Sequence, residues 1–243
     1  MSCQLIHHGA ARGVTGSCHE LRLGRDSLLI DCGQFQGDES SPAAARLDVS
    51  LARVRALLLT HAHIDHIGRL PELLSCGLTA PIYCSEATAL LAPVMLADAL
   101  RHSTGGQRSA IEHLLQRLGH LLRPLPFGQW QRLSLSDHSV LYFRLQPAGH
   151  ILGSAYLELR LPDGHVVVFS GDLGSGHSAL LPAPLSPERA DLLVLESTYG
   201  DRLHPQGEPR HRQLKAVVER SLRDGGAILI PAFSIGRTQE LLC

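Results

Sequence analysis

The sequence predicts a layered α/β fold. Its strand patterns are short runs rich in Val, Leu and Ile that fall into two groups, and helical patterns separate the groups. The length of 243 residues, with 44% hydrophobic and 19% charged residues, suits a globular protein with a sizeable core. The sequence has no repeat at a fixed period, which argues against a repeat architecture.

The first strands and the helices after them are bounded by turn and capping residues. Three strands are expected, at residues 18–23, 27–33 and 54–63, with a turn at 24–26. Three helices are expected next, at residues 68–76, 85–102 and 109–118. The last helix repeats apolar residues at three- and four-residue spacing: Ile111, Leu114, Leu115 and Leu118.

The second group of strands is expected at residues 138–150, 154–162, 164–172 and 190–198. Asp163-Gly164 forms a turn between two of them. Beyond a polar stretch, the pattern predicts a helix over 210–223 that Gly225 terminates. A strand over 227–232 and the start of a further helix complete the chain.

Charge and cysteine usage narrow the class of protein. The formal net charge is −1, so no global positive field attracts nucleic acid. The six cysteines include no C-x-x-C pair, and the first residues lack a secretory signal, which predicts a cytoplasmic protein with reduced thiols. The longest apolar run, residues 87–100, contains Pro93 and Asp98 and is too short to span a membrane.

The segment "THAHIDHIG" directly follows an apolar strand and carries the densest group of potential metal ligands: His61, His63, Asp65 and His66. Imidazoles and a carboxylate packed so tightly need a cation to compensate their desolvation. Other polar residues also follow apolar strands: Asp31, His150, Asp172 and Glu196. Such strand ends converge on one edge of a sheet, so we expect one shared site.

The residue types predict two metal positions in this site. One metal is expected to be bound by three imidazoles, a set typical of zinc: His61, His63 and His150. The second is expected to be bound by Asp65, His66 and Asp172, with Asp172 able to bridge both. Asp31 is expected to orient a ligand or the metal-bound water.

These motifs, in this order, resemble those of the metallo-β-lactamase superfamily. Further segments resemble its β-CASP branch, which includes ribonucleases: "GAARGVTGSCHEL", "LIDCGQFQG", "LLLTHAHIDHIGRLP", "AGHILGSAYLEL", "FSGDLG", "LLVLESTYGDR" and "ILIPAFSIGRTQELL". The resemblance implies an αββα sandwich, two Zn²⁺ ions, single-stranded RNA as substrate, and hydrolysis by a hydroxide held between the metals. It also allows a homodimer.

The resemblance assigns further roles residue by residue. It implies catalytic roles for four acidic residues: Asp31, Asp65, Asp172 and Glu196. It places Ser234 and Arg237 near a substrate groove. Two later His motifs of the family do not occur before Cys243. We therefore expect an N-terminal part of a longer enzyme: residues 1–205 as an incomplete metallo-β-lactamase domain, and 206–243 as the start of an inserted β-CASP α/β domain.

Two other functions stay open at this point. A small-molecule hydrolase of the thioesterase type would have the same metal ligands, but "LESTYGDR" and "PAFSIGRTQELL" favour the ribonuclease branch. A non-catalytic partner subunit would tend to lose metal ligands, whereas the ligand motifs here are intact. Without the later His motifs, the 243-residue chain itself could also lack activity.

Overall fold

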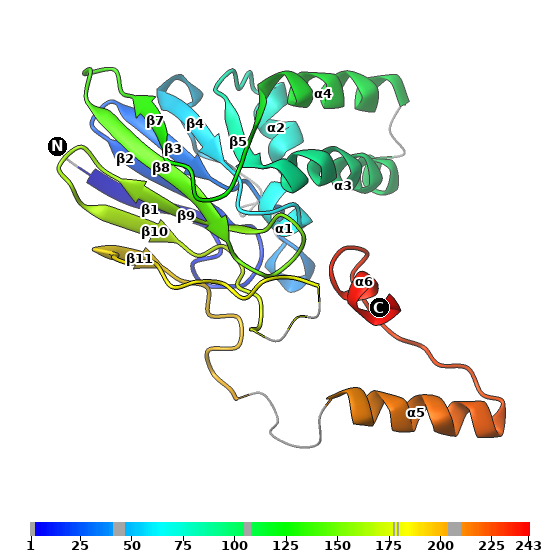
Figure 1. The fold of residues 1–243 in the computed structure, drawn as a ribbon. Helices are drawn as coiled ribbons and strands as arrows, with labels where there is room; N and C mark the ends of the chain where they lie inside the picture. The colour runs from blue at the N-terminus through cyan, green and yellow to red at the C-terminus, as the bar shows by residue number, and fades with distance from the viewer. Residues whose placement is uncertain (1–2, 41–46, 105–107, 177, 179, 204–209) are drawn as a thin grey trace. The chain divides into compact units, whose positions relative to one another are not determined.

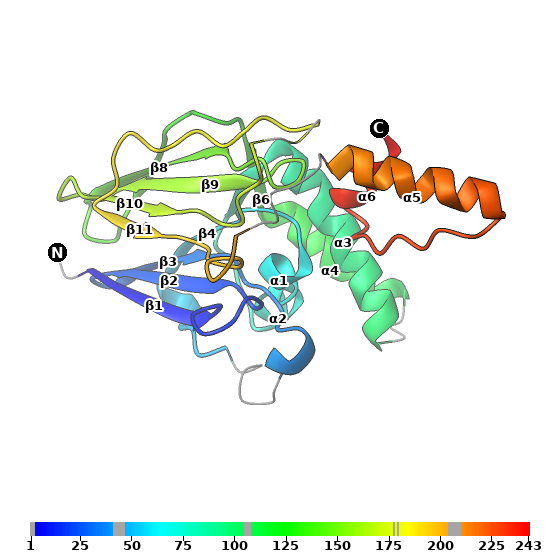
Figure 2. The ribbon, with the colours of Figure 1, turned by 90° about the horizontal axis from the view of Figure 1, so that it is seen from below.

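The computed structural model describes residues 3–40, 47–104, 108–176, 178, 180–203 and 210–243. The chain divides into two compact units, Met1–Glu196 and Ser197–Cys243. The first unit contains two β-sheets, one with six strands and one with five. Figure 2 shows these sheets as two separate layers.

The six-stranded sheet has the order β1-β2-β3-β4-β5-β6. Figure 1 labels its strands β1 to β5. Its strands are β1 (Cys3–Gly9), β2 (Cys18–Leu23), β3 (Asp26–Ile30), β4 (Val54–Leu58), β5 (Ile82–Ser85) and β6 (Leu122–Leu125). A tight turn at Gly24, with φ +60°, joins β2 and β3 as an antiparallel hairpin. From β3 to β6 the strands run parallel, so their carboxyl ends lie on one edge.

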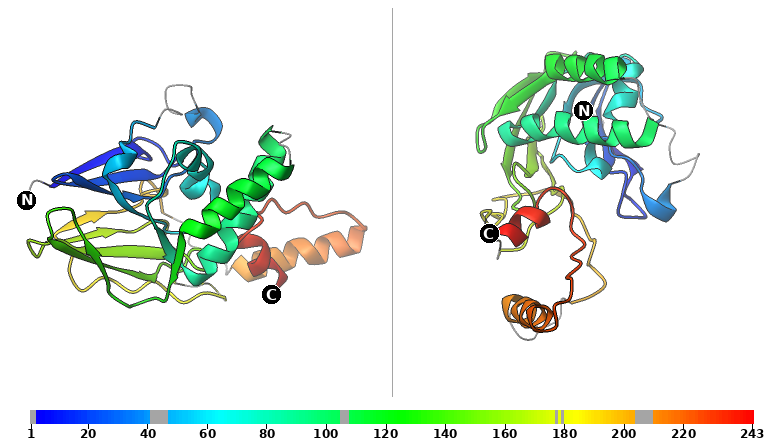
Figure 3. Two further views of the ribbon diagram at one scale, coloured as in Figure 1. Left: turned by 90° about the horizontal axis from the view of Figure 1, so that it is seen from above. Right: turned by 90° about the vertical axis from the view of Figure 1, so that its right-hand side faces the viewer.

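The described residues of the first unit contain four α-helices, which lie between β4 and β6 in the chain: α1 (Ile64–Ile67), α2 (Leu70–Ser75), α3 (Glu86–Thr104) and α4 (Arg108–Leu121). Two short 3₁₀ turns, Gly37–Glu39 and Leu51–Arg53, lie in the connection before β4. Side chains of α2, α3 and α4 share a buried cluster with one face of the first sheet. Figure 3 shows α3 and α4 beside one another. Among the described residues, no helix is both long and apolar enough to cross a membrane.

The five-stranded sheet has the order β11-β10-β9-β8-β7. Its strands are β7 (Gln131–Ser134), β8 (Val140–Pro147), β9 (Ala155–Arg160), β10 (Val166–Phe169) and β11 (Leu192–Val194). The pairs are antiparallel except β10–β11, which is parallel. The two groups of strands with helices between them are the arrangement that the sequence predicts.

The main core fills the space between the two sheets because alternate side chains of each strand point inward. Phe143, Leu157 and Phe169 come from the second sheet, and Leu21 and Leu58 face them from the first. The outer face of the second sheet carries a small cluster of buried strand residues: Tyr156, Val166 and Val168. The described part of this unit thus forms the helix, sheet and sheet layers of an incomplete αββα sandwich.

The second unit contains α5 (Arg210–Asp224) and α6 (Arg237–Leu242). Gly225 ends α5 with φ +67°, as the sequence predicts. The predicted strand at 227–232 is wrong, because these residues form no strand. A strand needs a neighbouring strand to satisfy its backbone hydrogen bonds, and the described part of this unit contains none. The expected domain boundary at 205/206 lies outside the described residues.

We expect the substitution Leu157→Ala to lower the free energy of unfolding by about 2–5 kcal/mol, because it leaves a cavity between the sheets. Leu157 has no exposed side-chain area in the inter-sheet cluster. Urea titration followed by circular dichroism measures this change. Leu90→Ala is the matched control, since Leu90 is 76% exposed on α3. Equal effects of the two substitutions would contradict the proposed core.

Candidate metal centre

The site lies where strands of both sheets end. Asp31 follows β3, and His61 follows β4 in the same parallel pair. The Ala155 N–H at the start of β9 donates to the Thr60 carbonyl at 2.8 Å, which joins the two sheets at this edge. His150 lies in the loop between β8 and β9, so the sheet contact brings it beside the end of β4.

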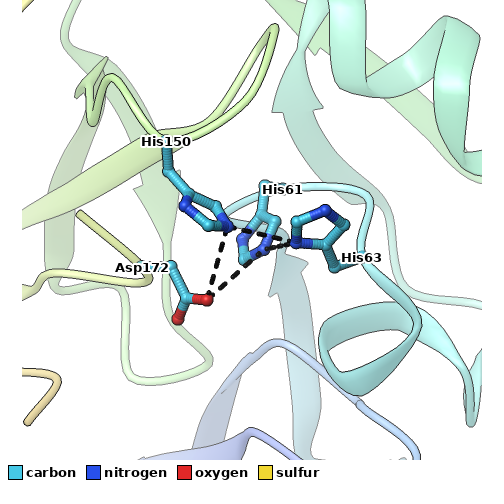
Figure 4. A group of neighbouring side chains, drawn as sticks. All are labelled: His61, His63, His150 and Asp172. Carbon is cyan, nitrogen blue, oxygen red and sulfur yellow. Dashed lines mark hydrogen bonds and ion pairs between the residues drawn. The ribbon is translucent and has the colours of Figure 1, made fainter. Parts of the chain in front are cut away.

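Three imidazole nitrogens converge at the first position (Figure 4). Nδ1 of His63 lies 3.1 Å from Nε2 of His61 and 3.1 Å from Nε2 of His150. Oδ2 of Asp172 lies 3.9 Å and 3.5 Å from these two Nε2 atoms, and all four ligand atoms lie within 4.8 Å of one another. Ligands of a tetrahedral zinc ion are about 3.3 Å apart, so this donor set fits zinc.

A second group adjoins the first through Asp172. Nε2 of His66 lies 3.2 Å from Asp172 Oδ1 and 3.9 Å from Asp65 Oδ2. The two oxygens of Asp172 therefore face different partners, Oδ1 toward His66 and Oδ2 toward the three-imidazole group. A carboxylate in this position has the geometry of a bridging ligand. The structure thus brings together all six residues that the sequence predicts as metal ligands, and their roles remain predictions.

Asp31 forms hydrogen bonds to the side of His66 that faces away from Asp172 and Asp65. Its Oδ2 accepts hydrogen bonds from Nδ1 of His66 and from the Thr60 hydroxyl, each at 2.8 Å, and its Oδ1 accepts from the Thr60 N–H at 2.8 Å. The residue is 1% exposed and adopts the left-handed conformation, with φ +58°. Asp31 therefore contacts His66, one of the predicted ligands, and leaves Nε2 of that ring directed toward Asp172 and Asp65.

Burial and neighbouring charges shift the pKa values of the histidines and aspartates in this site. Burial and the neighbouring imidazoles hold the pKa of His61 well below its usual value, so that ring is neutral and can bind a metal. Burial opposes the charged form of His66, but Asp31 and Asp172 outweigh burial and raise the pKa of His66 well above normal. Burial raises the pKa of Asp65. The hydrogen bond and charge of His66 outweigh burial at Asp172 and lower its pKa.

Close backbone contacts fix the segment that carries Asp65. A Cβ at Gly33 would overlap the Asp65 carbonyl oxygen, so only glycine permits this approach. The Ser17 N–H donates to the same carbonyl at 2.8 Å, and the Cys32 N–H donates to the His66 carbonyl at 2.8 Å. The loops after β1 and β3 therefore set where α1 begins.

The structure also assigns supporting roles to hydroxyls that the sequence analysis did not identify. Oγ of Ser154 accepts hydrogen bonds from the N–H groups of His150 and Ile151, at 2.9 and 3.2 Å. The Thr60 hydroxyl lies within hydrogen-bonding distance of Asp31 and of two ring nitrogens. The sequence signal for each residue is its position: Thr60 directly precedes His61, and Ser154 lies four residues after His150.

The remaining predicted site residues are not part of this group of six. Glu196 follows β11, and its Oε1 accepts a hydrogen bond from the Leu173 N–H at 3.3 Å, one residue beyond Asp172. In the second unit, Arg237 pairs with Glu240 at 2.6 Å. The Ser234 carbonyl accepts from the Gln239 side chain at 3.0 Å. The substrate roles expected for Ser234 and Arg237 remain predictions.

Comparison with known proteins agrees with this geometry. Residues 11–231 match the model of the metallo-beta-lactamase superfamily. The match covers most of the layered fold and includes the segments that carry the histidine–aspartate cluster. The chain belongs to the metallo-beta-lactamase superfamily, as its motifs predict.

Named relatives resemble the chain over nearly its whole length. Ribonuclease TTHA0252 of Thermus thermophilus is 41% identical over 98% of this chain and 54% of its own length. The RNase J-like protein of Methanocaldococcus jannaschii is 31% identical over 98% of this chain and 53% of its own. Transcription termination factor FttA of the same organism is 31% identical over 96% of this chain and 38% of its own length. These names agree with the β-CASP ribonuclease branch, and the chain spans about half or less of each relative.

A solved structure supports the fold. A protein of unknown function from Enterococcus faecalis V583 superposes with a TM-score of 0.59, covering 92% of this chain and 58% of that one. The sequence identity is 14%, so the likeness concerns the fold alone.

One histidine near the centre gives the stability of the protein a testable pH dependence. Nδ1 of His19 lies 2.8 Å from Nδ1 of His7, and its ring stacks on Phe169 with centroids 6.0 Å apart. Burial, reinforced by the charges of His7 and His66 and opposed by Asp31, lowers the pKa of His19 to about 4. His19 of the unfolded chain therefore becomes protonated as the pH falls below 6.5, whereas in the folded protein His19 stays neutral until the pH reaches about 4.

We expect this difference to cost about 2 kcal/mol of stability as the pH falls from 7 to 4.5. The substitution His19→Gln should remove that part of the loss, as measured by urea unfolding of the metal-free protein at both pH values. His165→Gln is the control, because His165 is an exposed histidine. The prediction is wrong if His19→Gln and the wild type lose the same stability between the two pH values.

Proposed function

We propose that this chain carries the metal centre of a ribonuclease that binds two zinc ions and hydrolyses phosphodiester bonds of single-stranded RNA. The observation that carries the proposal is the convergence of three imidazole nitrogens beside a carboxylate that also reaches a second His–Asp group. Two metal positions joined by a carboxylate suit phosphodiester hydrolysis, in which attacking and leaving oxygens both need stabilisation.

In this proposal one zinc ion is held by His61, His63 and His150, and a second by Asp65, His66 and Asp172. When bound, the two ions supply Lewis-acid stabilisation of the negative charge that develops on the phosphate. The imidazole-rich position is the tighter one, because nitrogen ligands suit zinc better than carboxylates do. Asp31 keeps His66 in the orientation that presents Nε2.

The carboxylates have separate tasks. Asp65 has a side chain that is 20% exposed, so water and substrate reach it, and it accepts the proton of the attacking water. Glu196 holds the backbone just after Asp172 through the Leu173 N–H. Ser234 and Arg237 contact the RNA, with the Arg237 guanidinium on a phosphate.

RNA is proposed as the substrate because two of the relatives described above carry the name of a ribonuclease. The protein has a formal net charge of −1, so attraction of the RNA depends on the metal ions and local arginines. A thioester hydrolase of the same superfamily would use the same ligands and is the competing outcome of the test below.

The first test is substrate choice. We expect the chain, incubated with zinc, to cleave single-stranded RNA and to leave a single-stranded DNA of the same sequence and a thioester intact. A chelator and the substitution Asp65→Ala should each abolish the cleavage. Asp163→Ala is the control, because Asp163 is an acidic residue in an exposed turn. Thioester hydrolysis without RNA cleavage would overturn the proposal.

The second test is metal content, which does not depend on turnover. We expect mass spectrometry of metals to find one tightly held zinc ion per chain and a second, weaker one that is lost first as free zinc is lowered by dialysis. His63→Ala should lose the more tightly held ion, whereas His113→Ala, a change at an exposed position on α4, should retain both. A folded wild-type chain without bound zinc would disprove the site assignment.

A further inference from the structure

The Thr60 hydroxyl is in contact with three groups of the centre at once. Its Oγ1 lies 2.8 Å from Asp31 Oδ2, 3.1 Å from His61 Nδ1 and 3.3 Å from His66 Nδ1. The residue is 1% exposed, so water does not compete for these contacts. One hydroxyl therefore touches a ligand of each proposed metal position.

The direction of each hydrogen bond follows from the number of protons available. Oδ1 and Oδ2 of Asp31 accept from the Thr60 N–H and from His66 Nδ1, which identifies the group as an accepting carboxylate. The single hydroxyl proton of Thr60 is thus donated to Asp31. Only lone pairs of Oγ1 remain for the two rings, so His61 donates from Nδ1. The Nδ1 proton of His66 is donated to Asp31 at 2.8 Å, with Oγ1 of Thr60 as a second, more distant acceptor at 3.3 Å.

A neutral imidazole that carries its proton on Nδ1 has a bare lone pair on Nε2. Nε2 of His61 is the atom that faces His63 and Asp172. Nε2 of His66 is the atom that faces Asp65 and Asp172. For the neutral His61 ring, the hydroxyl therefore selects the tautomer that presents Nε2 to the centre, and at His66 it supports the Nδ1 proton that Asp31 holds.

The position of the hydroxyl is fixed from several sides. The Thr60 N–H donates to Asp31 Oδ1 at 2.8 Å, and the Thr60 carbonyl accepts from Ala155 in the other sheet at 2.8 Å. A Cβ at Gly171 would lie 2.7 Å from the Thr60 Cβ, so only glycine fits beside it. The side chain has little freedom to leave the two rings.

We infer that Thr60 is a positioning residue that sets the tautomer of His61 and supports Asp31 in holding the Nδ1 proton of His66, so that one hydroxyl serves both metal positions. This inference rests on the metal centre proposed above. Loss of the hydroxyl removes the acceptor for His61 Nδ1 and one of the two acceptors for His66 Nδ1. Metal affinity at both positions then falls, although no metal ligand has changed.

The test compares Thr60→Val, which keeps the shape, with Thr60→Ser, which keeps the hydroxyl. We expect Thr60→Val to weaken zinc binding at both positions about 10-fold or more in competition with a chromophoric chelator. Thr60→Ser should retain most of the affinity. The matched control is Ser27→Ala, because the Ser27 hydroxyl is also buried and donates to a buried carboxylate, Glu20, at 2.6 Å. This control should lower stability and leave zinc affinity unchanged.

A second readout needs no variant and no activity. Long-range ¹H–¹⁵N spectra of the zinc-loaded wild-type chain should show His61 and His66 protonated on Nδ1. Protonation of His61 on Nε2 would overturn the inference, as would equal zinc affinities of Thr60→Val and the wild type. If the wild type binds no zinc, the metal centre itself fails; if it binds zinc and Thr60→Val binds equally well, only the role of Thr60 fails.

Discussion

The hydrogen bonds of the buried Asp31 carboxylate are the interactions on which the rest of the centre depends. It lies directly after β3, accepts from the backbone of the segment that follows β4, and holds His66 at 2.8 Å. Removing a carboxylate from water is costly unless its oxygens are satisfied, and here backbone, hydroxyl and imidazole donors satisfy them. The strand ends, the sheet contact and the orientation of the ligands therefore depend on one another.

The layered fold, and the convergence of the candidate ligands at one edge, could be predicted because both follow from local patterns. Apolar runs give the strands, and polar residues just beyond them give the edge at which a site forms. Asp31, His150 and Asp172 were found in this way, although they are far apart in the sequence. The motif spacing added the pairing of ligands, and the structure brings these side chains together.

The strands and hydrogen bonds that the sequence did not predict depend on contacts with residues far away in the chain. Strands β1, β5, β6 and β7 were missed because their composition is mixed: β1 contains two histidines, β6 a proline, and β5 and β7 polar residues. The equally short β10 and β11 are wholly apolar and were predicted. The run at 227–232 has strand-like composition but no neighbouring strand among the described residues of its unit. The roles of Thr60 and Ser154 depend on hydrogen bonds that form only after the loops have been placed.

The left-handed backbone at Asp31 restricts what can replace it. With φ +58°, the position disfavours most side chains, and Asp and Asn are the non-glycine residues that adopt this region most readily. Asparagine would keep the conformation but replace one accepting oxygen with a donating NH₂ group, opposite the donors Thr60 and His66. Glycine would keep the conformation and supply no acceptor. Aspartate is thus the residue that meets the conformational and the chemical requirement together, so any substitution at position 31 disturbs either the backbone conformation or the hydrogen bonds of the centre.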